Sequence, residues 1–259
     1  MSHKTIIVTD DHSIRTVTLN RPDRKNAMTR EMQVELISVI EETAATECCA
    51  LILTGAGDAF CSGLDLSELQ TMRDKTPAEH RTDAERIARL FVTLYELPVP
   101  TIAAVNGPAI AGGTGLATLC DFTLATPQAK FGFTEVRIGF VPALVSAFLA
   151  LQVGDKRCRD LLLTGRLFGA AEAQQLGLVN EVVEPEELIA RARALAKSLL
   201  ANSPESISAT KRLLAAQHRS WLDSAIVAAL EANAESRETA DFREGVSAFL
   251  EKRKPVWKR

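Results

Sequence analysis

The sequence predicts an α/β protein that ends in a helical region, and three observations support this prediction. Strand-like and helix-like segments alternate in the first half of the chain, as in folds whose parallel strands are joined by helices. Two glycine-containing turns, one at Gly63 and one at Gly112, each lead into a helical segment. From Pro142 onward the segments have helical periodicity, and several begin at proline, which the first helical turn tolerates. We expect a core over residues 1–185 and a helical region over residues 186–259.

The first 70 residues supply three of the expected strands. Residues 5–9 and 14–19 are rich in Ile, Val and Thr and flank a polar turn, which predicts two strands. Residues 28–45 place apolar side chains at helical spacing, with Thr29 suited to cap the helix. Residues 50–53 predict a buried strand, and a turn of small residues at 59–66 leads into a helix that ends near residue 70.

The next segments alternate in the same way. Residues 71–83 are polar and charged, and we expect a mobile loop or a frayed helix there. An amphipathic helix over 84–97 ends before two prolines, and a short buried strand over 103–105 ends at the turn signal Asn106-Gly107-Pro108. A helix is expected from Gly112, followed by extended segments over 120–125 and 130–133.

The last 118 residues predict helices only. Their periodicity and their prolines place these helices over residues 142–151, 156–163, 170–176, 185–200, 204–217, 222–238 and 242–251.

Composition excludes several classes of protein. A net charge of −3 provides no basic field for nucleic acid. Hydrophobic residues make up 46% of the 259 residues and charged residues 24%, as in soluble globular proteins. The five cysteines form no C-x-x-C pair, which favours a reducing compartment over disulfides or a zinc site. The N-terminus lacks a signal-peptide core, and the longest apolar run, over 138–151, is too short to span a bilayer. We therefore expect a cytoplasmic protein without a membrane partner.

The two glycine turns offer backbone N–H groups at the starts of helices. Two such donors converging on one carbonyl oxygen would form an oxyanion hole, although each turn taken alone is better explained as a tight connection. A phosphate-binding loop is disfavoured: Gly107 and Gly112 have the spacing of that motif, but Gly113 stands where it requires lysine. A dinucleotide-binding fingerprint is excluded because Thr118 stands at the position of its third glycine.

Glu135 is the candidate acid or base. The four histidines lie in turn-like or exposed contexts, and Cys61 has no base nearby in the sequence, so nucleophilic catalysis is not indicated. Glu135 lies between Phe133 and Val136, where a carboxylate is costly without a partner or a function. Desolvation there would raise its pKa toward the range useful for proton transfer. An ion pair with Arg137 explains its presence equally well at this stage.

Taken together, these motifs resemble the crotonase superfamily, also called the enoyl-CoA hydratase/isomerase family. The resemblance covers nearly the whole chain, and many motifs in the same order make it specific. The motifs are Arg21-Pro22…Asn26-Ala27-Met28, Ala59-Phe60-Cys61-Ser62-Gly63-Leu64-Asp65-Leu66, Ala103-Ala104-Val105-Asn106-Gly107, Gly112-Gly113, Cys120-Asp121, Phe131-Gly132…Glu135, Leu163-Thr164-Gly165, Ala173…Gly177-Leu178-Val179 and Glu244-Gly245…Phe249-Leu250-Glu251-Lys252-Arg253.

The resemblance implies a crotonase-like spiral of ββα units with a C-terminal helical region that mediates trimer formation, often as a dimer of trimers. It implies an acyl-CoA thioester as substrate, with coenzyme A part of the substrate and no metal or redox cofactor. The N–H groups of Leu64 and Gly112 would hold the thioester oxygen, and Glu135 would carry the proton. Further substrate contacts would come from Lys25 and Ala27 near the adenine and phosphates, Asp65 and Leu66 near the pantetheine, and Ser62, Gly63 and Gly113 in the two turns.

One position departs from the family pattern. Typical hydratases of this family carry two glutamates, and here the first of them is replaced by Gly115 while the second is Glu135. Adding water to a double bond requires that a water be oriented, that it lose a proton and that Cα gain one, which two carboxylates can divide between them. A 3-enoyl to 2-enoyl shift needs only one base. Because the sequence offers a single glutamate, the mechanism favours the isomerase interpretation.

The surrounding sequence favours hydration. Residues 134–146 resemble a hydratase subgroup that includes methylglutaconyl-CoA hydratase-like proteins of branched-chain catabolism, some of which also have glycine at the first site. Ala143-Leu144-Val145-Ser146 replaces the usual glycine-rich run and predicts a bulkier, more apolar wall of the acyl pocket. The sequence thus favours an enoyl-CoA hydratase, with a Δ3,Δ2-enoyl-CoA isomerase as the alternative. A catalytically silent acyl-CoA-binding relative is a third possibility, against which Glu135 argues.

Overall fold

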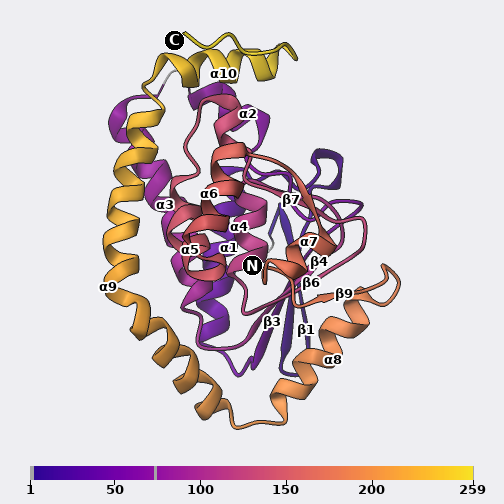
Figure 1. Cartoon of the computed structure of the whole chain (residues 1–259). Helices are drawn as coiled ribbons and strands as arrows, with labels where there is room; N and C mark the ends of the chain where they lie inside the picture. Colours follow the sequence, from indigo (N-terminus) through magenta and orange to yellow (C-terminus); the bar gives the residue numbers. More distant parts are fainter. Residues whose placement is uncertain (1–2, 73–74, 259) are drawn as a thin grey trace.

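A six-stranded sheet forms the centre of the protein (Figure 1). The computed structural model describes residues 3–72 and 75–258. The strand order is β1-β2-β3-β4-β6-β9; β1 and β2 pair antiparallel and each later pair is parallel. The strands are β1 Ile6–Asp11, β2 Ile14–Leu19, β3 Ala50–Gly55, β4 Thr101–Val105, β6 Phe122–Ala125 and β9 Glu181–Val182. The expected alternation of strands and helices is therefore confirmed.

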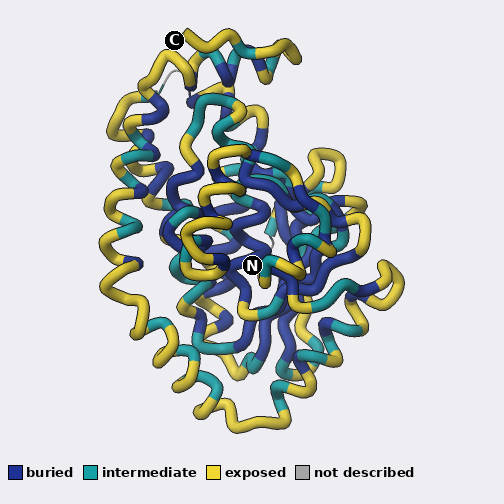
Figure 2. Tube along the Cα trace, viewed as in Figure 1, coloured by how far each residue is buried: buried dark blue, intermediate teal, exposed yellow. Residues whose placement is uncertain are grey.

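Both faces of this sheet are buried, because alternate residues of each strand point to opposite sides. Leu51 and Leu53 of β3 join the main core with helices α1 (Arg30–Ala44) and α3 (Pro77–Tyr95). Ile52 of the same strand joins a second cluster with Ala192 and Ala196 of α8 (Leu188–Leu200). Figure 1 shows α8 on the other side of the sheet from α1 and α3, and Figure 2 shows the strands buried between them. Helix α8 thus packs on the central sheet.

A second, three-stranded sheet lies next to the start of α4 (Gly112–Leu119). It has the order β5-β7-β8, with β5 Ala109–Ile110, β7 Lys130–Gly132 and β8 Phe168–Gly169. Strand β5 leads directly into the turn before α4, so this small sheet fixes the backbone at the glycine pair. The remaining elements are η1 Pro22–Arg24, α2 Leu66–Met72, η2 Glu135–Ile138, α5 Ala143–Val153, α6 Asp155–Thr164, α7 Ala170–Gln175 and α10 Ala240–Leu250.

One long helix replaces two of the predicted ones. The segments expected at 204–217 and 222–238 form the single helix α9, Pro204–Ser236, which runs along one side of the molecule (Figure 1). The four residues between them include neither glycine nor proline, so the backbone has no reason to break there. Leu222 and Ala229 of α9 are buried in the main core, and the helix contacts α3 and α5.

The expectation of a loop or frayed helix over residues 71–83 is wrong for most of that segment. Helix α3 begins at Pro77, directly after a capping box in which Thr76 and Glu79 satisfy each other's backbone N–H groups. His80 and Asp83 of its first two turns are buried. Residues 73 and 74, which fall in the same segment, lie outside the described residues. Across the described parts of the chain, no helix is both long enough and apolar enough to cross a membrane.

Candidate active site

A largely apolar cavity of about 240 Å³ brings together four of the predicted site residues. Leu64 and Ser62 come from the turn before α2, Gly112 from the start of α4, and Glu135 from η2. Other parts of the lining come from Met28, from α2, α3, β5 and η2, from the start of α5 and from the ends of α9 and α10. Segments far apart in the sequence therefore converge on one space, as ligand sites of enzymes do.

The N–H group of Leu64 is left available by the way its turn is held. Met28 N donates to the Gly63 oxygen at 2.7 Å and Asp65 N donates to the Met28 oxygen at 3.0 Å, which makes a parallel bridge between Met28 and Leu64. In such a bridge the N–H group of Leu64 itself points away from Met28. Gly63 allows the turn, because its φ of +90° is a conformation that other residues rarely adopt.

Gly112 provides a second available N–H group as the first residue of α4. The first N–H groups of a helix have no partner within it, and the helix dipole adds positive potential at this end. Within the described residues, neither Gly112 N–H nor Leu64 N–H donates a hydrogen bond to another group of the protein. Two unpaired donors therefore line the cavity that also contains Glu135.

The backbone just before Gly112 is strained. Ala111 has φ +51° and ψ −121°, a region that residues with a side chain rarely occupy. Neighbouring hydrogen bonds hold it there: Ala111 N donates to the Gly132 oxygen at 2.7 Å, and Gly115 N donates to the Ala111 oxygen at 3.1 Å. Strain of this kind persists where the surrounding structure fixes the chain, and it occurs often at functional sites.

Glu135 carries a buried carboxyl oxygen without a partner. The residue as a whole is only partly buried, but its Oε2 atom is inaccessible and accepts no hydrogen bond. Desolvation by burial raises the pKa of Glu135 to about 7. In the described structure no ion pair joins Glu135 to Arg137, so the simpler explanation of this residue as an ion-pair partner does not hold. The carboxyl group is suited to both accepting and returning a proton near neutral pH.

Apolar side chains fill the space beside Gly115. A Cβ atom on Gly115 would lie 2.9 Å from Cγ1 of Val145 and 3.0 Å from Cζ of Phe91. Both side chains also line the cavity. The position where typical hydratases are expected to carry a first glutamate thus has no room for one in this structure, and Val145 belongs to the bulkier wall predicted from the sequence.

The other predicted site residues do not line the cavity. Asp65 accepts hydrogen bonds from Arg21 Nη1 at 2.7 Å and from Ser67 N at 2.9 Å, and Arg21 also donates to the Ala27 oxygen. These contacts join the loop before α1 to the turn that carries Leu64. Lys25 pairs with Asp58. Contacts with the substrate stay predictions for all the residues outside the cavity lining, which are Lys25, Ala27, Gly63, Asp65, Leu66 and Gly113.

Sequence reasoning missed the contribution of the C-terminal helices to this cavity. Asn233 of α9, Arg237 at the C-cap of that helix and Phe249 of α10 line it, together with Met28 and Phe140. The sequence contains no local motif at Asn233 or Arg237, and helical periodicity alone places them on an ordinary surface helix. Their burial was the missing information: Asn233 is 4% exposed and Arg237 is 3% exposed.

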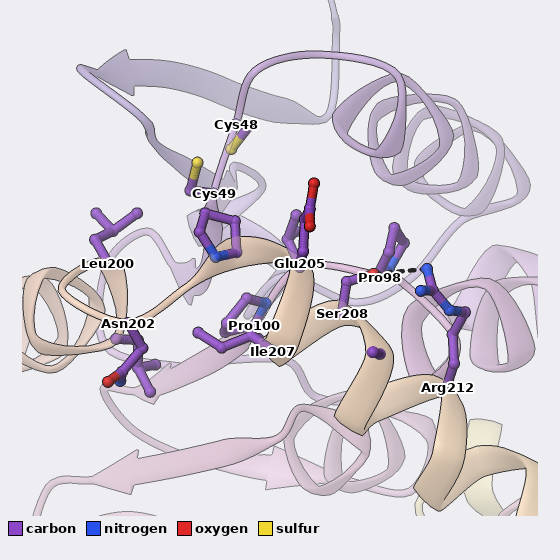
Figure 3. Close-up of a pocket in the computed structure, with 14 residues that line it drawn as sticks. Cys48, Cys49, Pro98, Pro100, Leu200, Asn202, Glu205, Ile207, Ser208 and Arg212 are labelled. Carbon is purple, nitrogen blue, oxygen red and sulfur yellow. Dashed lines mark hydrogen bonds between the residues drawn. The ribbon is translucent and has the colours of Figure 1, made fainter.

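A second, larger hollow of about 620 Å³ lies elsewhere, between the loop before β4 and the junction of α8 and α9 (Figure 3). Arg212 donates to Ser208 at 2.9 Å on its α9 wall. Cys48 and Cys49 lie on the opposite wall, and burial raises the pKa of Cys48, so this thiol is a poor nucleophile. Burial likewise raises the pKa of Cys61 to about 12. Within the described residues no group of three or more potential metal ligands occurs.

Comparison with known proteins places this fold and cavity in a family. The profile of the family described as enoyl-CoA hydratase/isomerase matches residues 9–259, and the chain belongs to this family. A putative enoyl-CoA hydratase of Thermus thermophilus is 44% identical over 93% of this chain and 96% of its own length. A short-chain-enoyl-CoA hydratase of Clostridium acetobutylicum is 35% identical over 98% of this chain and 97% of its own.

Solved structures agree with this assignment. A crystal structure of an enoyl-CoA hydratase/isomerase from Xanthobacter autotrophicus superposes with a TM-score of 0.89 at 32% identity, covering 97% of both chains. The family resemblance and the crotonase-like α/β fold expected from the sequence, including the C-terminal helical region, are therefore confirmed.

The glycine pair yields a matched prediction about stability. A Cβ atom on Gly113 would collide with the backbone oxygen of Cys61, whereas one on Gly112 meets only the terminal methyl of Met28, at 2.7 Å. Gly113→Ala should lower the free energy of unfolding by about 3 kcal/mol or more, and Gly112→Ala by about 1 kcal/mol or less. Denaturant unfolding followed by circular dichroism measures both. Equal losses for the two variants would contradict the described packing.

Proposed function

We propose that this protein is an enoyl-CoA hydratase-type enzyme acting on an acyl-CoA thioester. The supporting observation is the unpaired Glu135 carboxyl group in the same cavity as the unpaired N–H groups of Leu64 and Gly112. Relatives named as enoyl-CoA hydratases, matched over nearly their full length, support the same reaction. The substrate carries its own coenzyme A, and the proposed chemistry needs no metal or redox cofactor.

In the proposed reaction the two N–H groups bind the thioester oxygen. They stabilise the negative charge that this oxygen gains as an enolate forms, and they are already oriented before the substrate binds. The Glu135 carboxylate accepts a proton from water while the water oxygen bonds to C3 and the electrons of the double bond move toward the thioester oxygen. Glu135 then returns the proton to C2. A single carboxyl group carries out both transfers.

Double-bond isomerisation is the second candidate, and the filled space beside Gly115 favours it. With Val145 and Phe91 there, the described lining of the cavity contains no carboxyl group besides Glu135 that could orient a water. Glu135 would remove a proton from C2 of a 3-enoyl-CoA, the N–H pair would stabilise the dienolate, and Glu135 would return the proton to C4. This sequence of steps uses the same three groups and needs no water.

We also propose the outer contacts that the family resemblance implies. Lys25 and Ala27 would lie near the adenine and phosphates of the bound coenzyme, and Asp65 and Leu66 near its pantetheine. Lys25 is exposed, and it lies in the loop that the hydrogen bond from Arg21 to Asp65 holds in place. This exposure supports a contact with the part of the coenzyme that faces solvent. Five unpaired cysteines suit a reducing compartment and support a cytoplasmic location.

Substitution of Glu135 tests the central role. Glu135→Gln should lower kcat by roughly 10²-fold or more while acyl-CoA binding stays within a few fold. Because burial raises the pKa of Glu135 to about 7, kcat/KM of the wild type should rise with pH around that value, as the carboxylate forms. Steady-state kinetics and calorimetric titration measure these quantities. A variant with retained turnover would exclude Glu135 as the proton carrier.

The same pKa shift predicts a pH dependence of stability. The folded protein holds this proton more tightly than the unfolded chain, whose carboxyl group titrates near 4.5. The contribution of Glu135 to stability therefore declines as pH rises from about 4.5 to about 7, and Glu135→Gln should lack this decline. Parallel slopes for wild type and variant would show that the carboxyl group is not desolvated.

One assay separates the two candidate reactions. The protein is incubated with crotonyl-CoA and, separately, with a short-chain 3-enoyl-CoA. The consumption of each thioester is followed spectrophotometrically. A hydratase consumes the first by adding water, and an isomerase consumes the second and produces the 2-enoyl thioester. Consumption of neither by the wild type would contradict the proposed function.

We further propose a homotrimer, or a hexamer formed as a dimer of trimers. Apolar side chains remain exposed along α9, and most of its first half is open to solvent (Figure 2). The exposed apolar residues of this helix are Leu213, Leu214, Trp221 and Val227. Large apolar side chains left exposed along one helix support an interface there. Light scattering should give three or six times the mass of one chain, and Leu213→Glu should lower that mass; a monomer at all concentrations would contradict the proposal.

A further inference from the structure

Arg237 lines the candidate active-site cavity with a guanidinium group that lacks hydrogen-bond partners. Its side chain is 0% exposed, and Nε, Nη1 and Nη2 all have no acceptor in the described structure. A buried guanidinium with five N–H donors and no acceptor is costly to the folded protein. An unpaired group of this kind inside a ligand cavity indicates that a ligand completes it.

The nearest carboxylate does not fulfil this role. Asp83 approaches Arg237 Nη1 only to 3.9 Å, beyond hydrogen-bond distance, and it already accepts from Lys75 Nζ and Arg86 Nη2, each at 2.5 Å. In the described structure Asp83 is the only carboxylate within 4 Å of these three cations. The cluster therefore has excess positive charge, and Arg237 is the member that faces the cavity.

Among the described residues, the other groups near Arg237 include an aromatic ring and two polar side chains with unpaired atoms. Its guanidinium carbon lies 5.3 Å from the centre of the Phe140 ring. Asn233 lies one helical turn earlier on α9, lines the same cavity, and has a buried Oδ1 without a partner. The neighbouring His80 is also buried with Nδ1 unpaired, and burial lowers its pKa, so it adds no acceptor with negative charge.

We propose that Arg237, with Asn233, binds a carboxylate at the far end of the acyl group, so that the preferred substrate is the monothioester of a dicarboxylic acid. This inference rests on the proposed function, because it assigns the substrate class of that same cavity. A carboxylate offers two oxygens to the planar guanidinium, which matches its paired N–H groups. Burial lowers the pKa of Arg237 to about 10, so the group is still cationic at neutral pH.

The acyl group is a better source for this carboxylate than the coenzyme. Arg237 is fully buried beside Phe140, in the part of the cavity that also contains Leu69 and Met72. A coenzyme phosphate would have to lose its water to reach that position, whereas the acyl chain enters the cavity in any productive complex. The anion therefore belongs to the part of the substrate that the cavity encloses.

Equilibrium binding of saturated thioesters tests the inference without requiring turnover. Each probe pair has one chain length and differs in its end group: glutaryl-CoA against pentanoyl-CoA, adipoyl-CoA against hexanoyl-CoA, and pimeloyl-CoA against heptanoyl-CoA. We expect the wild type to bind the carboxylated member of at least one pair roughly 10- to 100-fold more tightly, as for hydrogen bonds to charged groups. Isothermal titration calorimetry of the full-length protein measures each dissociation constant.

Variants assign the preference to the cavity. Arg237→Met should abolish it, Asn233→Leu should reduce it, and Arg237→Lys should retain part of it. The matched control is Arg89→Met. Arg89 lies on α3, the helix that also carries Asp83, but its side chain is exposed and pairs with Glu41, so this variant should leave the preference unchanged. Free coenzyme A should bind the wild type and Arg237→Met equally.

Several results would overturn the inference. Equal binding within every pair by the wild type would do so, as would an undiminished preference in Arg237→Met. If Arg237 is only the structural partner of Asp83, Arg237→Met loses stability and keeps the wild-type preference. If Arg237→Met does not fold, Arg237→Lys and Asn233→Leu test the inference instead, and an undiminished preference in both would overturn it. A parallel loss of free coenzyme A binding would assign the anion to a phosphate. Failure of the proposed function appears separately, as absent turnover with an intact binding preference.

Discussion

The close packing of residues 59–64 against residues 107–113 determines where the chemistry of this protein can occur. Phe60 N and Cys61 N both donate to the Pro108 oxygen, and Ile110 N donates to the Cys61 oxygen at 2.8 Å. Gly113 permits this contact because any side chain there would meet the Cys61 backbone. The contact fixes two turns that are distant in sequence, and each turn presents one unpaired N–H group to the cavity. Strain at Ala111 is the cost of directing the second one.

The acid–base properties of Glu135 follow from its burial and from the lack of a hydrogen-bond partner. Its Oε2 atom accepts no hydrogen bond in the described structure, and burial raises the pKa of the carboxyl group to about 7, so the group can both accept and return a proton. Val145 and Phe91 occupy the space beside Gly115, and Glu135 is the single carboxyl side chain among the described residues that line the cavity. The same apolar packing thus both prepares the acid–base group and limits the reaction to one such group.

Much of the fold and the polar centre of the site could be predicted from the sequence. Runs of Val, Ile, Leu and Thr predicted the strands, because both faces of the sheet are buried, and the glycine turns predicted Leu64 and Gly112. The capped start of α3 was missed because the polar composition of residues 71–83 outweighed a signal that the sequence does contain. Thr76 and Glu79 have the spacing of a capping box, and Pro77 stands at the first helical position. The continuity of α9 and the burial of Asn233 and Arg237 depend on contacts across the whole chain, which no local pattern contains.

The most direct test of this explanation is exchange of the C2 hydrogens of a saturated acyl-CoA with solvent. Exchange requires a base beside C2 and stabilisation of the enolate oxygen, and it is independent of whether water adds or a double bond moves. Butyryl-CoA is incubated in D₂O with the wild type or with Glu135→Gln, and deuterium at C2 is followed by NMR. We expect incorporation with the wild type and none above background with Glu135→Gln. Equal incorporation by both would contradict the assignment of Glu135 as the group that moves the proton.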